Sequence, residues 1–341
     1  MRSMRSLRAL LAAIAGACLL TGAIVACGAG KPAALAQRYG EAGPHAVAVL
    51  DATWTDPARR REMPVRIHYP RTDKGAWPVV IFSHGLGASH RQYDFLGRHW
   101  ASHGYASVHP AHKGTDLETF RESRFPVADV FRALSVKAVA DRILDVRFAI
   151  DRLEQMTRGE APLDGRLDLR RIGVAGHSYG ALTTLLATGQ AFRDGNGGWR
   201  SLPDPRIKAA IEMSAPLINR RGEYAQAFGP ITAPMLHLTG TLDSIFFSAP
   251  GDRRVPFDFS RAPDQYLLTL EGADHVTFAG VPRFDAAARE RDAGHQSAIR
   301  MSTVAFWDAY LRDDRRARRW LANGAFAQSM GAQGKLELRK E

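Results

Sequence analysis

Residues 176–180 read GHSYG, a Gly-x-Ser-x-Gly pattern whose central serine is a candidate nucleophile. The pattern follows an apolar run at residues 172–175, and the residues after it favour a helix from Ser178 to about Ala187. In a nucleophile elbow a strand turns sharply into a helix, and the two glycines let neighbouring elements pack close to that turn. We therefore predict that Ser178 is a nucleophile. The alternative is a glycine-rich turn in which the serine has no chemical role.

A serine hydroxyl is a weak nucleophile until a base removes its proton, and the usual base is a histidine late in the chain. The chain has 12 histidines, so position must select among them. His275 follows the apolar run 266–270 and precedes the last predicted helix, as this base should. His237 falls inside a predicted strand, and His295 falls at the start of the last helix. We predict that His275 is the base.

A carboxylate must orient the imidazole of the base and stabilise its protonated form. Asp243 follows the predicted strand 235–238 through a short loop, which is the usual place for this acid. Asp274 is adjacent to His275 in the sequence and cannot easily face its ring. Glu212, near the end of the preceding strand, is the second choice. We predict Asp243 as the acid, with a merely turn-forming aspartate as the alternative.

Residues 83–87 read SHGLG and directly follow the apolar run 79–82. A tetrahedral intermediate carries a negative oxygen that needs preorganised N–H donors. One donor should be the backbone N–H of Tyr179, the residue after the nucleophile, and the other that of Leu86 in this loop. The helix that begins at Ser178 also directs its positive end toward this place. A plain tight turn at residues 83–87 is the alternative.

The rest of the sequence predicts alternating strands and helices that would position these residues. A helix opens at Ser135 with apolar residues at a 3.6-residue period as far as Leu153, and the last helix runs from about Gln296 to Leu311. Strands separated by helices predict an α/β fold with a mostly parallel central sheet covered on both faces. Strands are expected at residues 46–50, 64–69, 79–82, 105–109, 171–175, 207–213, 235–238 and 266–270, and a surface loop at 190–203.

The composition excludes several other classes of protein. Apolar residues are 45% and charged residues 24% of the 341 residues, which excludes a disordered or collagen-like chain. The formal charge is +11, but the basic residues are scattered and no zinc finger, RNP motif or basic recognition helix is present, so no nucleic-acid partner is expected. His109 and His112 could form half a metal site, but no late carboxylate–histidine pair completes it. Neither a metal nor a cofactor is therefore expected.

The N-terminus has the pattern of an export signal. Arginines at positions 2, 5 and 8 precede an uncharged run at residues 9–25, and residues 24–27 read IVAC, which is similar to the bacterial lipobox. We predict a lipoprotein signal peptide at residues 1–26, lipidation of Cys27, a tether at 27–44, the α/β domain at 45–312 and a basic tail at 313–341. The protein is then expected to be exported and attached by lipid to the bacterial cell envelope. The alternative is a secreted or periplasmic protein cleaved near Ala26.

These stretches together resemble the dienelactone-hydrolase-like α/β-hydrolases. The pieces that carry the resemblance are FSHGLGASHRQY, WASHGY, RIGVAGHSYGA, HLTGTLD and GADH, within about residues 45–312. That neighbourhood includes the platelet-activating factor acetylhydrolases and the cutinase-like polyester hydrolases. The resemblance implies an α/β-hydrolase fold with these roles: nucleophile Ser178, base His275, acid Asp243, and oxyanion donors Leu86 and Tyr179.

One position departs from the family pattern. In the acetylhydrolase branch the resemblance implies an acid after the sixth strand of the core, and this place is near Ser214, which has no carboxylate. The difference favours Asp243 as the acid and weakens a prediction of acetylhydrolase activity itself.

The function predicted from these residues is hydrolysis of carboxylic esters, with a small-molecule ester as substrate. Short acyl groups are expected to be preferred, because the only segment able to cover the site, residues 115–134, is rich in charged residues. Phe120, Phe125 and Phe131 in this segment are candidates to line an acyl pocket. Two alternatives stay open: a peptidase or amidase that uses the same three residues, and a non-catalytic binding lipoprotein that has kept the fold.

Overall fold

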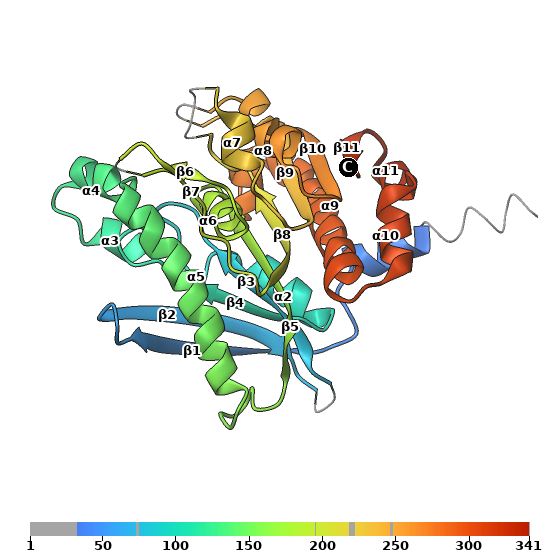
Figure 1. Cartoon of the computed structure of the whole chain (residues 1–341). Helices are drawn as coiled ribbons and strands as arrows, with labels where there is room; N and C mark the ends of the chain where they lie inside the picture. The colour runs from blue at the N-terminus through green and yellow to red at the C-terminus, as the bar shows by residue number, and fades with distance from the viewer. Residues whose placement is uncertain (1–32, 73–74, 195, 218–221, 246–247, 341) are drawn as a thin grey trace, which may run out of the picture.

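A nine-stranded sheet forms the centre of the molecule in the computed structural model, which describes residues 33–72, 75–194, 196–217, 222–245 and 248–340 (Figure 1). The strand order is β1-β2-β4-β3-β5-β8-β9-β10-β11. The pairs from β4 to β10 are parallel, and the pairs β1–β2, β2–β4 and β10–β11 are antiparallel. The strands are β1 (Val47–Asp56), β2 (Arg61–Pro70), β3 (Trp77–Ser83), β4 (Ala106–Pro110), β5 (Leu167–His177), β8 (Ile207–Met213), β9 (Met235–Leu242), β10 (Gln265–Asp274) and β11 (Gly334–Arg339). The mostly parallel sheet confirms the predicted α/β class.

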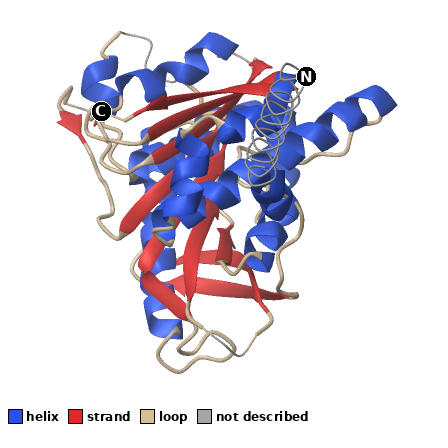
Figure 2. Cartoon of the chain, turned by 90° about the vertical axis from the view of Figure 1, so that its right-hand side faces the viewer, coloured by secondary structure: helices blue, strands red, loops and turns tan. Residues whose placement is uncertain are grey.

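Helices lie on both sides of this sheet (Figure 2). They are α2 (Asp94–Ser102), α3 (Leu117–Arg121), α4 (Pro126–Ala133), α5 (Val136–Met156), α6 (Tyr179–Ala187), α7 (Tyr224–Phe228), α8 (Val255–Phe259), α9 (Ala286–Leu311), α10 (Arg315–Ala322) and α11 (Ala325–Met330). Three 3₁₀ turns, η1 (Pro250–Arg254), η2 (His275–Ala279) and η3 (Gly331–Gln333), and a short hairpin of β6 (Phe192–Arg193) and β7 (Trp199–Arg200) complete the described chain.

Alternation along the strands builds two hydrophobic cores, one on each face of the sheet. In β3, Val80 and Phe82 pack into the core that contains side chains of α2 and α9, whereas Val79 and Ile81 pack into the core that contains side chains of α5 and α6. Successive strand side chains point to opposite faces, so a run that is apolar throughout needs cover on both sides. The buried runs in the sequence predicted this arrangement.

Most predicted elements are present, with longer bounds. Helix α5 begins after Ser135, whose hydroxyl accepts a hydrogen bond from the Ala138 N–H, as the sequence predicts. The last long helix, α9, begins at Ala286, ten residues before the predicted start, because Asp285 caps it by accepting from the Ala288 N–H. The expected loop at 190–203 contains the β6–β7 hairpin.

The two ends of the chain differ from the predicted tether and tail. Residues 33–40 are helical, and Tyr39 is fully buried with its ring centroid 5.4 Å from that of Trp320 in α10. This helix lies beside α10 in Figure 1. Residues 313–341 were predicted as a basic tail beyond the domain, but β11 pairs with β10 as the edge of the sheet. The many arginines of α10 favoured the prediction of a solvated tail, but Ala317, Trp320 and Leu321 on the same short helix are buried.

The predicted signal peptide at residues 1–26 and the predicted lipidation site Cys27 lie outside the described residues. Within the described part of the chain, no helix combines the length and the apolar character needed to cross a membrane.

Candidate active site

The predicted site residues lie at one edge of the sheet. Ser178, Asp243 and His275 each come directly after a parallel strand, namely β5, β9 and β10, and Leu86 lies three residues after β3. These strands are close neighbours in the order β3-β5-β8-β9-β10. Because the carboxyl ends of parallel strands meet at one edge of a sheet, residues far apart in the sequence converge there.

Ser178 occupies a sharp turn between β5 and α6. Its backbone has φ 55° and ψ −118°, a conformation that a residue with a Cβ rarely adopts. The Ser178 N–H donates to the Met213 carbonyl at 2.9 Å, which ties the turn to the end of β8. A Cβ on Gly180 would lie 1.8 Å from the Ser83 carbonyl oxygen, and one on Gly176 would lie 2.2 Å from the Gly180 carbonyl oxygen. Both glycines are therefore required for the close approach of these segments.

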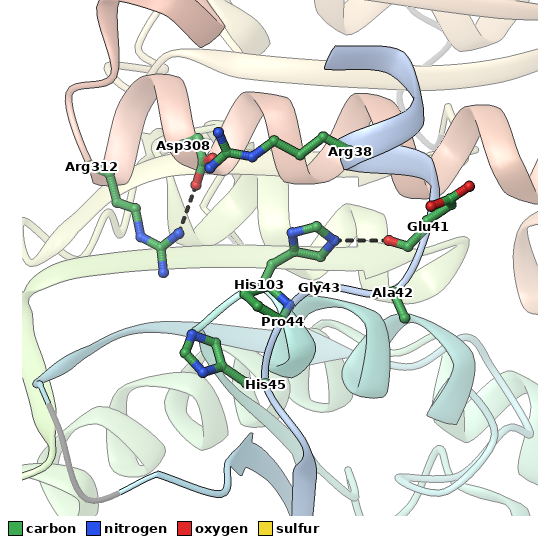
Figure 3. Close-up of a pocket in the computed structure, with 9 residues that line it drawn as sticks. All are labelled: Arg38, Glu41, Ala42, Gly43, Pro44, His45, His103, Asp308 and Arg312. Atoms are coloured by element: carbon green, nitrogen blue, oxygen red, sulfur yellow. Dashed lines mark hydrogen bonds and ion pairs between the residues drawn. The ribbon is translucent and has the colours of Figure 1, made fainter. Parts of the chain in front are cut away.

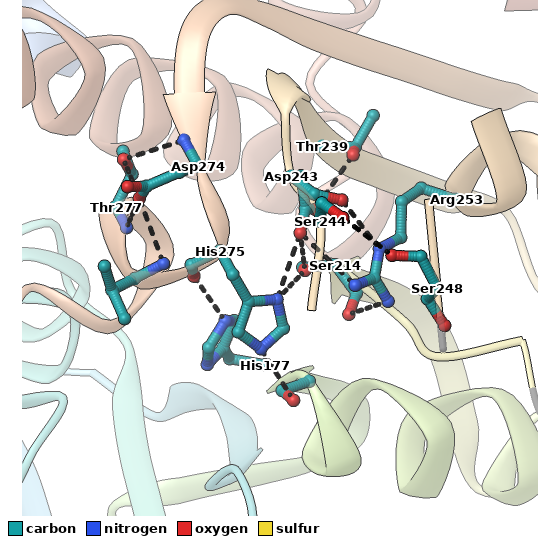
Figure 4. Close-up of polar contacts among 12 residues, drawn as sticks. His177, Ser214, Thr239, Asp243, Ser244, Ser248, Arg253, Asp274, His275 and Thr277 are labelled. Carbon is teal, nitrogen blue, oxygen red and sulfur yellow. Dashed lines mark hydrogen bonds and ion pairs between the residues drawn. The ribbon is translucent and has the colours of Figure 1, made fainter. Parts of the chain in front are cut away.

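Ser178, His275 and Asp243 are joined by hydrogen bonds. The Nε2 atom of His275 is 2.9 Å from the Ser178 Oγ. Its Nδ1 atom is 3.0 Å from an Asp243 carboxylate oxygen (Figure 4). Ser178 is half-buried, His275 is 7% exposed and Asp243 is fully buried. The structure thus brings together the three residues predicted as nucleophile, base and acid.

Ser214, at the end of β8, bridges the base and the acid. Its hydroxyl donates to Asp243 at 2.8 Å and lies 2.6 Å from the His275 Nδ1 (Figure 4). Since the Ser214 hydroxyl proton points to Asp243, its oxygen accepts from an Nδ1–H of His275. This tautomer leaves the Nε2 lone pair of His275 facing Ser178, as a general base requires. The family resemblance placed Ser214 where an acid was expected, but its bridging contacts were not predicted.

The charge of Asp243 is held by its surroundings. Burial alone would raise the pKa of its carboxyl, but the hydrogen bond from His275, the positive charge of Arg253 and the hydrogen bond from Ser214 together lower the pKa below its ordinary value. Thr239 donates to the second carboxylate oxygen at 2.9 Å. Arg253 is 1% exposed, lies 3.4 Å from Asp243 and donates to the carbonyls of Ser214 and Ala215 at 3.2 and 2.8 Å. Asp243 therefore faces His275 as a carboxylate.

The alternative acids and bases have other partners. Glu212 accepts from His237 at 2.8 Å and from the Ala215 N–H at 3.1 Å. Asp274 caps the turn η2 by accepting from the Val276 and Thr277 N–H groups. His295 bonds through its Nε2 to the Glu271 carbonyl at 2.8 Å.

Comparison with known proteins points in the same direction as the geometry. Residues 43–119 match the family described as platelet-activating factor acetylhydrolase, isoform II. The platelet-activating factor acetylhydrolase of Cavia porcellus is 26% identical over an alignment of 172 residues, and the match covers 39% of this chain and 37% of that protein. The chain resembles the platelet-activating factor acetylhydrolase-like α/β-hydrolases. The resemblance predicted from the motifs is thereby confirmed, and the mostly parallel sheet with helices on both sides is consistent with the predicted α/β-hydrolase fold.

The segment that matches the acetylhydrolase family includes the predicted oxyanion loop but ends well before Ser178. Leu86 in this loop is half-buried and packs against the cluster that contains Tyr179. Tyr179 is the first residue of α6, and the first N–H groups of a helix have no acceptor within it. Gly85, the residue before Leu86, lies close to the serine, because a Cβ there would lie 3.5 Å from the Ser178 Cβ. The loop that contains Leu86 therefore lies against the turn that contains Ser178 and Tyr179.

His177, which precedes the serine, was not predicted as part of the site. Its Nε2 lies 3.0 Å from the His275 carbonyl and its Nδ1 lies 2.8 Å from the Tyr93 hydroxyl, which in turn accepts from the Gly85 N–H at 3.3 Å. Burial, followed by the charge of His275, lowers the pKa of His177 to about 3, so the ring is neutral. It links the oxyanion loop to the backbone of the base. The one signal for His177 in the sequence was its place directly before the serine, at a variable position of the GHSYG motif.

The other candidates from the sequence lie apart from this site. His112 bonds to Asp145 and Ser83 at 3.0 and 3.1 Å, whereas His109 bonds to Ser107 at 2.8 Å. Among the described residues no three potential ligands gather around a possible metal position. His109 and His112 thus take part in separate hydrogen bonds.

A separate cavity of about 390 Å³ lies between the helix at 33–40, the end of α2 and the end of α9 (Figure 3). In its wall His103 bonds to the Glu41 carbonyl at 3.0 Å, and Arg312 pairs with Asp308 at 2.9 Å. None of the three residues joined at the serine lines this cavity.

Proposed function

We propose that the protein is a serine hydrolase that cleaves carboxylic esters through an acyl-enzyme. One observation carries the proposal: a continuous line of hydrogen bonds runs from the Ser178 Oγ through His275 to Asp243. The similarity to acetylhydrolases, whose name describes hydrolysis of an acetyl group, supports an ester as the bond that is cleaved.

In the first half of the reaction the Ser178 oxygen attacks the acyl carbon while His275 takes its proton at Nε2. The carbonyl oxygen becomes an anion beside the backbone N–H groups of Leu86 and Tyr179. His275 then gives its proton to the alcohol oxygen, and the alcohol leaves. In the second half a water molecule loses its proton to His275, attacks the acyl-enzyme and releases the acid, and Ser178 regains its proton. Asp243 stabilises the imidazolium in both halves.

The proposed substrate has a short acyl group. Residues 115–134, with α3 and α4, are the expected cover of the site. Phe125 and Phe131, which the sequence offered as pocket residues, are 73% and 74% exposed, so they add no apolar wall in this structure. Phe120 does lie near the site, within 3.6 Å of the position of a Cβ on Gly87. Each added methylene gains about 0.8 kcal/mol only where an apolar wall receives it.

The proposed location is the bacterial cell envelope. It rests on the basic, apolar and small-residue pattern of residues 1–26 and on Cys27 at the end of the lipobox-like IVAC. A protein secreted without lipid is the alternative outcome of the test given in the Discussion.

The experiment that tests the proposed activity combines a fluorophosphonate probe with a serine variant. We expect the probe to label Ser178, and Ser178→Ala to fold normally, escape labelling and lose esterase activity by several orders of magnitude. Ser329→Ala is the matched control, because Ser329 only bonds to the Phe326 carbonyl in the distant helix α11. Activity of Ser178→Ala within tenfold of wild type would exclude this nucleophile. Comparing 4-nitrophenyl acetate with 4-nitroacetanilide separates an esterase from an amidase, and a folded wild type without labelling indicates a binding protein.

A further inference from the structure

Arg142 in α5 is a buried arginine whose direct partners are uncharged. It is 1% exposed. Its Nε donates to the Thr183 hydroxyl at 2.9 Å, its Nη1 donates to the Thr115 hydroxyl at 2.7 Å, and its Nη2 donates to the His84 carbonyl. The centre of the guanidinium lies 4.8 Å from the centroid of the Tyr179 ring. The three hydrogen bonds satisfy donors of the guanidinium, and none of these four contacts pairs its charge with a carboxylate.

A carboxylate one turn along the same helix is already engaged with other partners. Asp145, one turn along α5, accepts from Arg61 at 2.8 and 2.9 Å and from His112 at 3.0 Å, and it pairs with Arg59 at 2.8 Å. Among the described residues, no ion pair joins Arg142 to a carboxylate. Burial lowers the pKa of Arg142 to about 10, so it is still a cation at neutral pH. A buried charge without a paired opposite charge is costly to keep.

The partners of Arg142 belong to, or are bonded to, the two segments that supply the proposed oxyanion donors. The His84 carbonyl lies two residues before Leu86. Thr115, which accepts from Arg142 through its hydroxyl, also accepts from the Gly87 N–H through its carbonyl at 2.9 Å. On the other side, the Tyr179 ring packs on the guanidinium.

Thr183 provides a further link between Arg142 and the segment that contains Tyr179. The Thr183 hydroxyl, which accepts from Arg142, donates to the Tyr179 carbonyl at 3.1 Å. A single cation therefore touches the loop after β3 and the first turn of α6.

We propose that Arg142 is a positioning residue that clamps the Leu86 and Tyr179 segments together and supplies a fixed positive charge behind the oxyanion. This role rests on the proposed serine hydrolase function. Arg142 does not touch the reacting atoms. It acts through the backbone that it holds and through its field, which a buried environment screens weakly. Because the oxyanion forms only during the reaction, the charge should favour the transition state over the bound ester.

The test compares two neutral replacements of Arg142 with one that keeps the charge. Arg142→Met removes the charge with similar length, Arg142→Gln removes it but keeps an N–H donor, and Arg142→Lys keeps it. Arg147→Met is the matched control, since Arg147 also lies on α5 and donates two bonds to the Leu202 and Pro203 carbonyls at 3.1 Å. The readouts are kcat and KM on 4-nitrophenyl acetate, the rate at which a fluorophosphonate labels Ser178, and inhibition by an alkylboronic acid.

The boronic acid separates electrostatics from packing. The Ser178 oxygen adds to boron while His275 takes the proton, and the adduct is a tetrahedral anion. We expect Arg142→Met and Arg142→Gln to lower kcat by about 10- to 100-fold with KM within threefold, and to weaken boronate inhibition by a similar factor. Arg142→Lys should recover at least tenfold of that loss. Arg147→Met should match wild type in every readout.

Several results would overturn the proposal. One is a folded Arg142→Met or Arg142→Gln within threefold of wild type in kcat and in labelling rate. Another is an equal loss in the methionine and lysine variants, which would mean that the charge has no role. A loss confined to KM would refute a role in the transition state. If Arg142→Met does not fold at the assay temperature, Arg142→Gln decides the question. If neither folds, Arg142→Lys is compared directly with wild type, and a kcat of the folded lysine variant more than about tenfold below wild type refutes the role of the charge.

The failure of this role can be told apart from failure of the proposed function. A wild type that the probe does not label and that cleaves no ester removes both. A labelled, active wild type with unaffected Arg142 variants removes only the role of Arg142.

Discussion

Buried histidines should make this protein unstable in mild acid. Burial lowers the pKa of His99 to about 3, that of His112 to about 4 and that of His177 to about 3. A second cause that lowers each pKa is a neighbouring basic group, namely His103 for His99, Arg142 for His112 and His275 for His177. An unfolded histidine has a pKa of about 6.5. Between about pH 6.5 and pH 4 the unfolded chain therefore binds protons that the folded chain does not, and stability falls as the pH falls.

The size of the effect follows from the linkage relation. At pH 5 each of the three histidines is about 97% protonated when unfolded and almost entirely neutral when folded, so unfolding takes up nearly three protons. Each proton changes the free energy of unfolding by about 1.4 kcal/mol per pH unit, which gives a slope of about 4 kcal/mol per unit near pH 5. From pH 7 to pH 5 the three together remove about 5 to 6 kcal/mol. A typical domain has only about 5–15 kcal/mol in total.

The assay is urea unfolding at half-unit steps from pH 7 to pH 5. A variant sharpens it: His99→Gln removes one of the three sites but keeps a donor for the Tyr39 carbonyl, which His99 contacts at 2.9 Å. Its slope near pH 5 should be smaller than that of wild type by about 1.4 kcal/mol per pH unit, the contribution of one histidine. Carboxylates contribute less than histidines to the slope of the unfolding free energy above pH 5, because their unfolded pKa values lie near 4. A wild-type free energy of unfolding that changes by less than about 2 kcal/mol over this range would refute the reasoning.

Three further outcomes test the proposed chemistry and location. Asp243→Asn should lower kcat by about 10⁴-fold and Glu212→Gln should have little effect, since Asp243 contacts His275 whereas Glu212 bonds to His237; the reverse result would show that the acid is Glu212 on β8. In a bacterial host, Cys27→Ala should move the protein from the membrane fraction to the soluble fraction, because acyl chains bury about 0.8 kcal/mol per methylene; equal solubility and a mature N-terminus elsewhere would exclude lipidation. For 4-nitrophenyl esters of increasing acyl length, kcat/KM should stop rising beyond about four carbons, whereas a steady rise through about twelve would indicate a lipase-type pocket.

The strands and the reactive residues could be predicted because their signals are local. A buried run such as 172–175 is read from a few adjacent residues, and the tight turn at GHSYG needs glycine at fixed spacing. The order of strands then places Ser178, Asp243 and His275 at one edge of a parallel sheet. The general design of the candidate site was therefore predictable from sequence motifs and fold class together.

The supporting residues were not predictable, because their signals depend on distant contacts. Arg142 meets Thr183 across 41 positions, and Ser214 meets His275 across 61. Neither side chain has a type or spacing that marks it in the sequence. The edge strand β11 was missed for the same reason, since its pairing with β10 joins residues more than 60 positions apart.

The position of Ser214 leads to a last prediction, that the acid can be moved to the neighbouring strand. The His275 Nδ1 lies 2.6 Å from the Ser214 oxygen and 3.0 Å from Asp243, so a carboxylate from the end of β8 could reach the same ring nitrogen. Ser214 has φ 61°, a conformation that aspartate tolerates better than most residues. Arg253 already contacts the Ser214 carbonyl and Asp243 and would offer its charge to either position.

The exchange Ser214→Asp/Asp243→Ser should therefore be more active than Asp243→Ser alone. We expect a recovery of at least about tenfold in kcat, because a carboxylate again orients the Nδ1–H of His275. Ser214→Asp by itself should lose stability, since two buried carboxylates would then share one imidazole. Esterase assays on the four proteins, with thermal unfolding to show that each is folded, give the comparison. A double variant no more active than Asp243→Ser would mean that the acid must approach His275 from β9, and that Ser214 serves only to hold the ring.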